Sequence, residues 1–270
     1  MKTEIKSYLQ RINFTATPKP DFDTLRQLQI CHLKTVPYEN LDIMRNIPLS
    51  LEIEDIYEKI VVRGRGGYCF ELNGLFAWLL KELGFKVVEY MARYLRDEKE
   101  IPMRRHRVLR VSTGPSGGTE PSGGTGPSGG DYLCDVGVGA VIPRVPLPMV
   151  LGQISEQGPN QSERYKLEKE HFLGNVLYEW KNNEWKKVYS FTEEEQLNID
   201  YVMPSFYCEQ HPESFFRTMD MVHIFTDDGR KSVAGREFKI FSPKGVDVTI
   251  PGSEEVYEKL LETHFNIKSL

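Results

Sequence analysis

The most regular apolar pattern of the chain begins at Cys69 and predicts a long helix that ends at Gly84. Three glycines, Gly64, Gly66 and Gly67, lie directly before it, and glycine is unfavourable inside a helix. We therefore expect a tight glycine turn that delivers Cys69 at the start of a helix whose apolar face packs into a core. The side chains of this face recur three and four positions apart, at Leu72, Leu75, Phe76, Leu79, Leu80 and Leu83.

The pattern of apolar residues before this helix differs from the pattern after it. Helical spacing recurs before it, in residues 5–12, 23–32 and 53–62. After it, short runs rich in Val, Tyr and Leu and separated by turns predict an antiparallel sheet or barrel. These runs are residues 86–95, 107–112, 132–138, 164–167, 172–180 and 185–189.

The last part of the chain mixes strands with a final helix. Strand-like runs at 222–226 and 238–241 precede a helix for which Ser253 is the expected N-cap. The residues expected on the apolar face of this helix are Val256, Leu260, Leu261 and Phe265. These patterns divide the chain into a helical part (1–85), a β part (86–195) and an α/β part (196–270).

Composition and charge exclude several classes of protein. Of the 270 residues, 40% are apolar and 27% charged, which is typical of a globular chain rather than a disordered or fibrous one. No apolar run is long enough to span a membrane, and no export signal is apparent, so we expect a cytoplasmic protein. The net charge is −5, without the basic excess of a nucleic-acid binder.

The four cysteines are far apart in sequence and form no CxxC pair, so we expect free thiols. Cys31 beside His32, and Cys208 three residues before His211, weakly suggest metal ligands. Because no second ligand pair accompanies either of them, we predict no metal site.

Residues 113–130 are three hexapeptide repeats of Thr, Gly, Pro and Ser, with Glu in place of one Gly in the second repeat. This composition has no apolar surface to bury, and Gly does not recur at every third position as in collagen, so we interpret it as a flexible loop insertion. Without the insertion, the runs before and after it form a hairpin. Such a hairpin would bring His106 and Asp135 together at its open end.

Cys69 is the candidate nucleophile. The first turn of a helix carries free N–H groups and partial positive charge, which should ease ionisation of a thiol placed there. The alternative is a small buried core cysteine. His106 could act as the base and Asp135 could orient it, in a papain-like order of Cys, His and Asp.

Several motifs in this chain resemble those of the arylamine N-acetyltransferases. The segment from Arg65 to Asn73 reads RGGYCFELN and resembles the RGGxCxExN motif of that family. PYENL at 37–41, HRVL at 106–109 and YLCDVGVG at 132–139 resemble three further motifs in the family's order. Later landmarks occur at 200–201, 211–216 and 228–230, so the resemblance covers nearly the whole chain.

The resemblance implies an α+β multidomain fold of papain-like type, with an N-terminal helical bundle, a central antiparallel β-barrel and a C-terminal α/β lid. It implies a role in xenobiotic metabolism, with acetyl-CoA as co-substrate rather than a permanently bound cofactor, and an aromatic amine or hydrazine as acceptor. The implied triad is Cys69, His106 and Asp135. Glu39 and Arg65 match the family's buried supporting pair.

The chain departs from the family pattern at two positions near the site. Val138 replaces a phenylalanine that contributes to the acceptor pocket, for which Tyr38 and Tyr68 are further candidates. Arg105 stands where a small hydroxyl residue is common. Together with Met103 and Arg104 it is a candidate for binding CoA, although these arginines also suit a solvated surface. We further expect backbone N–H groups at Cys69 and near 103–105 to stabilise an oxyanion.

Two other functions remain compatible with the same residues. A cysteine hydrolase or transglutaminase-like amidase could use the same triad with a different acceptor. A binding protein that retains the fold is the non-enzymatic alternative, and an intact triad disfavours it.

Overall fold

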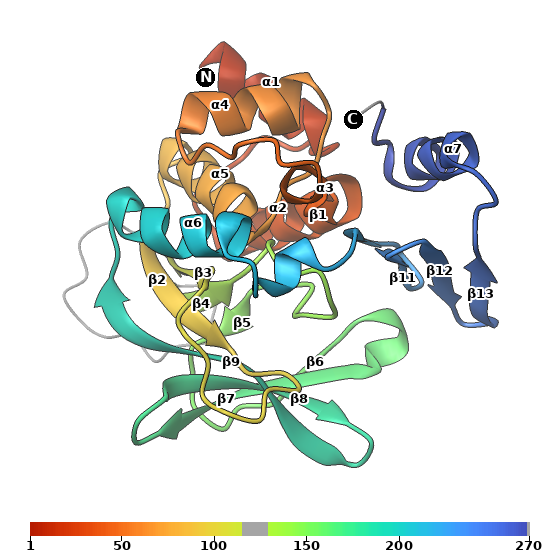
Figure 1. Ribbon diagram of the computed structural model, residues 1–270. Coiled ribbons are helices and arrows are strands. Elements are labelled where there is room, and N and C mark those ends of the chain that lie inside the picture. Colours follow the sequence, from red (N-terminus) through yellow and green to blue (C-terminus); the bar gives the residue numbers. More distant parts are fainter. Residues whose placement is uncertain (115–128, 269–270) are drawn as a thin grey trace.

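The computed structural model describes residues 1–114 and 129–268 of the chain. Most of the repeat segment 113–130 therefore lies outside the described residues. Figure 1 shows helices gathered on one side of a long curved sheet, with the C-terminal strands and helix α7 at the periphery. Among the described residues, none of the helices is both long and apolar enough to cross a membrane.

The helices follow the predicted apolar spacing. The α-helices are α1 (Thr3–Arg11), α2 (Phe22–Thr35), α3 (Leu41–Met44), α4 (Ile53–Tyr57), α5 (Cys69–Glu82), α6 (Val202–Gln210) and α7 (Glu254–Phe265). The short helical segments are η1 (Glu58–Val62), η2 (Pro159–Gln161), η3 (Asn198–Tyr201) and η4 (Phe215–Arg217). The helix predicted at 53–62 continues from α4 into a π-helical turn, η1. Helix α5 begins at Cys69 as predicted, and Gly84 follows it with a positive φ of 89°.

Eight of the strands form one antiparallel sheet in the order β5-β4-β3-β2-β9-β8-β7-β6. These strands are β2 (Lys86–Tyr94), β3 (His106–Thr113), β4 (Gly130–Cys134), β5 (Leu147–Pro148), β6 (Ser155–Gln157), β7 (Glu163–Glu170), β8 (Gly174–Lys181) and β9 (Glu184–Glu195). In the described part of the chain β5 and β6 remain its edges, so the predicted barrel is a near-closed sheet. The predicted hairpin of β3 and β4 is confirmed, with Thr113 paired to Gly130.

A second antiparallel sheet carries the C-terminal strands in the order β1-β10-β11-β12-β13. Its strands are β1 (Tyr38–Glu39), β10 (Met221–Phe225), β11 (Arg230–Ala234), β12 (Glu237–Ser242) and β13 (Gly245–Thr249). Its first strand comes from the helical part of the sequence, and Tyr38 pairs with His223. Tyr38 also forms a parallel bridge with Gly67, so β1 lies between the C-terminal sheet and the loop before Cys69.

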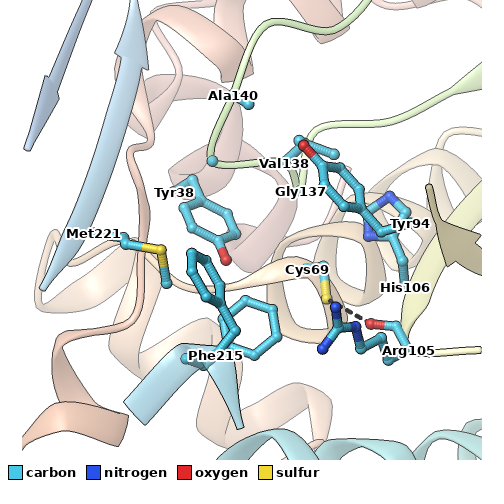
Figure 2. A pocket seen from close by; sticks show the side chains of 12 residues that line it. Tyr38, Cys69, Tyr94, Arg105, His106, Gly137, Val138, Ala140, Phe215 and Met221 are labelled. Carbon is cyan, nitrogen blue, oxygen red and sulfur yellow. Dashed lines mark hydrogen bonds between the residues drawn. The ribbon is translucent and has the colours of Figure 1, made fainter. Parts of the chain in front are cut away.

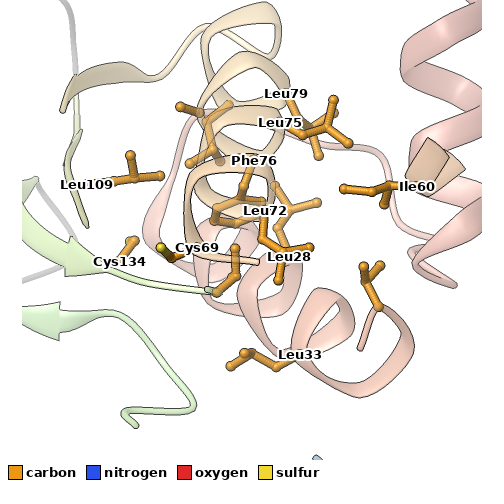
Figure 3. Close-up of a cluster of buried hydrophobic side chains, with 14 of the residues drawn as sticks. Leu28, Leu33, Ile60, Cys69, Leu72, Leu75, Phe76, Leu79, Leu109 and Cys134 are labelled. Carbon is orange, nitrogen blue, oxygen red and sulfur yellow. The ribbon is translucent and has the colours of Figure 1, made fainter. Parts of the chain in front are cut away.

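Helix α5 lies at the centre of the largest apolar cluster. Figure 3 shows its Leu72, Leu75 and Phe76 surrounded by side chains of the neighbouring helices on one side and of the sheet on the other. Because it is enclosed on both sides, α5 is apolar around most of its circumference. This packing fixes the position of its first residue, Cys69.

One predicted strand end and one residue assigned to a helix face are wrong. The run 132–138 is a strand only as far as Cys134, because the chain then turns towards α5 as Val136 N–H donates to the Asn73 side chain. In α7, Val256 is 44% exposed and Tyr257 is buried in its place. The helix packs through a narrow stripe in which Tyr257 and Phe265 contact the ring of Phe238.

Candidate active site

Cys69 is the first residue of α5 and is buried. Glycine is needed before Cys69 because another part of the chain lies very close to this turn. A Cβ on Gly66 would lie 2.1 Å from the Pro37 carbonyl oxygen. The Tyr68 N–H, at the N-cap, donates to Glu71 Oε2 at 3.0 Å. The turn is therefore held both by the chain in front of it and by the helix that it begins.

Beneath this turn lies a network of buried charges. Arg65 forms ion pairs with Glu39 and Asp42, each at 2.8 Å, so the predicted Glu39–Arg65 pair is present in the structure. Lys59 bridges Asp42 and Glu71, also at 2.8 Å. Burial alone would lower the pKa of Lys59, but the carboxylates around it, Glu71 first, raise the pKa. The PYENL and RGGYCFELN motifs contain only part of this network, because Lys59 and Asp42 lie outside both motifs.

His106 is the first residue of β3, and Asp135 directly follows β4. His106 Nε2 lies 2.7 Å from Asp135 Oδ2, and both side chains are buried. Because an ionised carboxylate only accepts hydrogen bonds, Nε2–H is the donor and Nδ1 is left as an acceptor. The hairpin thus brings these two residues together as the sequence predicted.

Asn73, one turn along α5 from Cys69, connects the helix to the hairpin. Its Nδ2 donates to Asp135 Oδ1 at 2.9 Å and to the Arg107 carbonyl oxygen at 2.6 Å. Its Oδ1 accepts the Val136 N–H at 2.9 Å. Asn73 belongs to the RGGYCFELN motif, but no role was predicted for it. Its position four residues after Cys69, on the same helix face, is the signal in the sequence for a role at the site.

Cys69 and His106 line one cavity of about 110 Å³ (Figure 2). The thiol contacts the Arg105 carbonyl oxygen at 3.7 Å. Burial raises the pKa of the Cys69 thiol, with further contributions from Cys208 and Asp135, whereas backbone groups of Arg107 and Phe70 lower it. The first-turn backbone of Phe70 lowers the pKa of the thiol, as expected at a helix start, but desolvation outweighs this contribution. A thiolate here needs a proton acceptor such as His106.

The remaining predicted site residues separate into two groups. Tyr38 and Val138 line the cavity, but Tyr68 does not, because it is fully buried and its hydroxyl contacts Ser205 of α6. Met103 is 39% exposed and does not line the cavity. Arg104 pairs with Glu194 at 3.3 Å.

Arg105 is the member of the 103–105 segment that reaches the cavity. Its side chain pairs with Glu98 at 2.8 Å. Its backbone N–H donates to the Ala92 carbonyl oxygen of β2 at 3.0 Å, directly before β3 begins. The expected oxyanion donor near 103–105 is therefore not Arg105 N–H, because that group is already bonded.

The other walls of the cavity were missed by the sequence analysis. They are Tyr94, Gly137, Gly139, Ala140, Phe215, Phe216 and Met221. Gly139 allows a close approach, since a Cβ there would lie 2.5 Å from the Tyr38 ring. Phe215 and Phe216 come from η4, more than a hundred residues from Cys69, and no local pattern links them to the site.

Tyr189 packs behind the histidine, with its ring centroid 5.4 Å from that of His106.

Neither of the two cysteine–histidine pairs considered as metal ligands, Cys31 with His32 and Cys208 with His211, is supported by its surroundings. The Nδ1 of buried His32 bonds the Tyr8 hydroxyl at 3.0 Å, and Cys208 is buried whereas His211 is exposed. Across residues 1–114 and 129–268, no group of three or more His, Cys, Asp or Glu side chains could hold a metal ion.

The chain is similar to known proteins over most of its length. A family model described as N-acetyltransferase matches residues 21–269. The arylamine N-acetyltransferase of Mycobacterium tuberculosis H37Rv is 34% identical over 251 residues, covering 92% of this chain and 83% of the relative. That of Escherichia coli K12 is 32% identical over 228 residues, covering 84% and 75%.

Solved structures show the same similarity over the whole fold. The M. tuberculosis arylamine N-acetyltransferase superposes with a TM-score of 0.84 at 32% identity, covering 97% of this chain and 92% of that one. The Mycobacterium marinum enzyme in complex with CoA gives 0.85 at 31% identity, with coverage of 97% and 92%. The chain therefore belongs to the arylamine N-acetyltransferase family and is an acyltransferase.

Proposed function

We propose that this protein transfers the acetyl group of acetyl-CoA to an aromatic amine or hydrazine through an acetyl-Cys69 intermediate. The observation that carries the proposal is that Cys69 and His106 line one cavity while Asp135 holds His106 from behind. The names of its relatives and the CoA complex of the M. marinum enzyme support the choice of donor and acceptor. As in papain-like enzymes, the nucleophile comes from a helix and the base from the sheet.

In the first half-reaction, His106 takes the proton of the Cys69 thiol. The resulting imidazolium offsets the desolvation that raises the pKa of the buried thiol. The thiolate attacks the thioester carbonyl, and the C–S bond to CoA breaks after the bond to Cys69 forms. The first-turn N–H of Cys69 stabilises the oxyanion, and the protonated His106 returns its proton to the leaving thiolate of CoA.

In the second half-reaction, the amine nitrogen attacks the carbonyl carbon of acetyl-Cys69 while His106 accepts a proton from it. The C–S bond to Cys69 then breaks, and His106 returns the proton to the Cys69 thiolate as the acetylated amine leaves. The cavity walls favour a flat aromatic acceptor, since Tyr38, Phe215 and Phe216 line the cavity. The two phenylalanines provide aromatic surface that Val138 lacks. A narrow, largely apolar cavity also limits the access of water to the intermediate.

The three sequence parts receive separate roles in this proposal. Residues 1–85 supply the nucleophile, 86–195 supply the base and its orienting carboxylate, and 196–270 supply the wall that covers the acceptor. Met103 and Arg104 lie outside the cavity. We assign them to the distal part of CoA, whose phosphates suit an arginine.

Steady-state kinetics tests the proposal. A shared acetyl-cysteine predicts parallel double-reciprocal lines when acetyl-CoA is varied at several acceptor concentrations. Peptide mass analysis after incubation with acetyl-CoA alone should place the acetyl group on Cys69. Intersecting lines without an acetylated Cys69 would contradict the proposal. CoA release at equal rates with and without amine would identify a hydrolase instead.

A further inference from the structure

Strand β13 forms the outer edge of the C-terminal sheet, and in the described part of the chain no strand pairs with its outer side. Figure 1 shows it at the periphery of the molecule. The other sheet edges are short, since β1 and β5 have two residues each and β6 has three, whereas β13 has five. A short edge strand protects a sheet from pairing with another chain, so β13 is the least protected edge.

Three apolar side chains along this edge are exposed to water. Val246, Val248 and Ile250 are 50%, 51% and 71% exposed. They occupy alternate positions, so they point to the same side of the sheet. Val246 pairs with Phe241 of β12 on that side, while α7 packs on the other side through Phe238. An open edge strand with a row of exposed apolar side chains is a site at which another strand can associate.

The backbone groups of the same three residues point outward from the sheet. The connection between β12 and β13 has two residues, so Ser242 and Gly245 form the first hydrogen-bonded pair of the hairpin. Alternate residues from Gly245 to Thr249 therefore bond inward to β12, and the residues between them present their N–H and C=O groups to solvent. Pro251 continues this geometry, because it restricts Ile250 before it to extended backbone.

A second copy of the chain matches this edge in one register. The sequence VDVTI, residues 246–250, has apolar residues placed symmetrically about Val248. If the two-fold axis passes at Val248, each Val246 lies opposite an Ile250, and Asp247 lies opposite Thr249. If the axis passes at Asp247 instead, two carboxylates lie directly opposite each other, which is destabilising. Side-chain chemistry therefore favours the register centred on Val248.

We propose that two copies of this chain associate through β13 as an antiparallel pair centred on Val248, which joins their C-terminal sheets into one. Both copies use the same surface, so association stops at the dimer. A pair of five-residue strands buries less surface than a stable dimer usually does, so this dimer is weak and dissociates on dilution. The inference is independent of the proposed function, because no residue of β13 lines the cavity with Cys69.

Sedimentation velocity over a wide range of protein concentration tests the association. The sedimentation coefficient of the parent should rise with concentration towards that of a dimer. Val248→Lys places two cations opposite each other at the axis and should raise the dissociation constant at least about tenfold. Val62→Lys is the matched control, because Val62 is 59% exposed and lies in η1 of the helical part. It should leave the dissociation constant unchanged, and circular dichroism should show that both variants are folded.

Disulfide trapping tests the register. In the proposed pair, Asp247 of one copy and Thr249 of the other form a non-hydrogen-bonded pair, in which side chains come closest. A mixture of the Asp247→Cys and Thr249→Cys proteins should therefore form a cross-linked dimer under mild oxidation. Neither variant alone should cross-link through its new cysteine. Peptide mass analysis identifies the linked residues and separates this bond from any bond of the native thiols.

Three results would overturn the inference. The first is a parent that stays monomeric at every concentration, whether the edge is then open or is covered by a different protein. The second is a dimer that persists unchanged in Val248→Lys, because association would then use another surface. The third is cross-linking of Asp247→Cys with itself but not with Thr249→Cys, because the strands would then pair in the other register.

Discussion

The two halves of the site are held in place by different kinds of interaction. The turn before Cys69 rests on the alternating buried charges Glu39, Arg65, Asp42, Lys59 and Glu71. The His106–Asp135 side is held by the neutral amide of Asn73 and by backbone N–H groups. The cysteine half should therefore be sensitive to the loss of any one charge, because each loss leaves a buried ion without its partner. The histidine half should be sensitive to hydrogen-bond geometry.

The largest expected effect is at Cys69, where the two halves meet. Cys69→Ala should abolish turnover while leaving the thermal midpoint nearly unchanged, because neither support contacts the sulfur. In the parent protein, iodoacetamide should alkylate Cys69 before Cys31, Cys134 or Cys208, and acetyl-CoA should protect it. Cys31→Ala is the control and should retain activity. Uniform labelling of the four thiols, followed by peptide mass analysis, would contradict the assignment.

Asp135→Asn should show that the histidine half depends on hydrogen-bond geometry. The asparagine oxygen can still accept from Asn73 and Gly137, which turns its amide N–H₂ towards His106 Nε2. The imidazole must then carry its proton on Nδ1, so that nitrogen can no longer take the Cys69 proton. Turnover should fall by about 10⁴ with the circular dichroism spectrum unchanged. A loss smaller than tenfold would mean that Asp135 does not set the tautomer.

A comparison of Lys59→Met with Asn73→Ala tests the two kinds of support directly, the buried charges and the hydrogen bonds of Asn73. Lys59→Met leaves Glu71 without an ion-pair partner and Asp42 with Arg65 alone, and should lower the free energy of unfolding by about 3–5 kcal/mol. Asn73→Ala leaves the Arg107 carbonyl and the Val136 N–H without this partner, while Asp135 keeps its bonds to His106 and Gly137, and should cost about 1–3 kcal/mol. Urea denaturation measures both changes. Adding Glu71→Gln to Lys59→Met should recover part of the loss. A larger cost for Asn73→Ala than for Lys59→Met would reverse the comparison.

The smallest effect is expected for the repeat segment within the histidine half. Replacing residues 114–129 with Asn-Gly should preserve the pairing of Thr113 with Gly130, because that turn suits the twist of paired strands. The shorter connection should stabilise the protein by about 1 kcal/mol or less. Activity should stay within a few-fold of the parent. A KM for acetyl-CoA that rises more than about tenfold with folding intact would make the segment part of the CoA site.

The sequence was most informative where local pattern determines structure. The apolar spacing after Cys69 predicted α5. The two strand-like runs on either side of the repeats predicted the hairpin that joins His106 to Asp135. The walls formed by Phe215 and Phe216 could not be predicted, because only tertiary packing brings η4 to the cysteine. Tyr68 was misplaced for a related reason: its neighbour Cys69 lines the cavity, whereas its own ring points away and packs against α6.

Strand β1 gives the molecule a mechanical connection between its C-terminal sheet and its nucleophile. Glu39 N–H donates to the Gly67 carbonyl oxygen at 2.8 Å, while Asn40 receives the Met221 N–H at 2.7 Å through its side chain. The turn before Cys69 therefore cannot open without disturbing the strand pairing at β10. In amide hydrogen exchange, these segments should behave as one cooperative unit, so that an occupant of the cavity slows exchange in β10 as well as beside the cysteine.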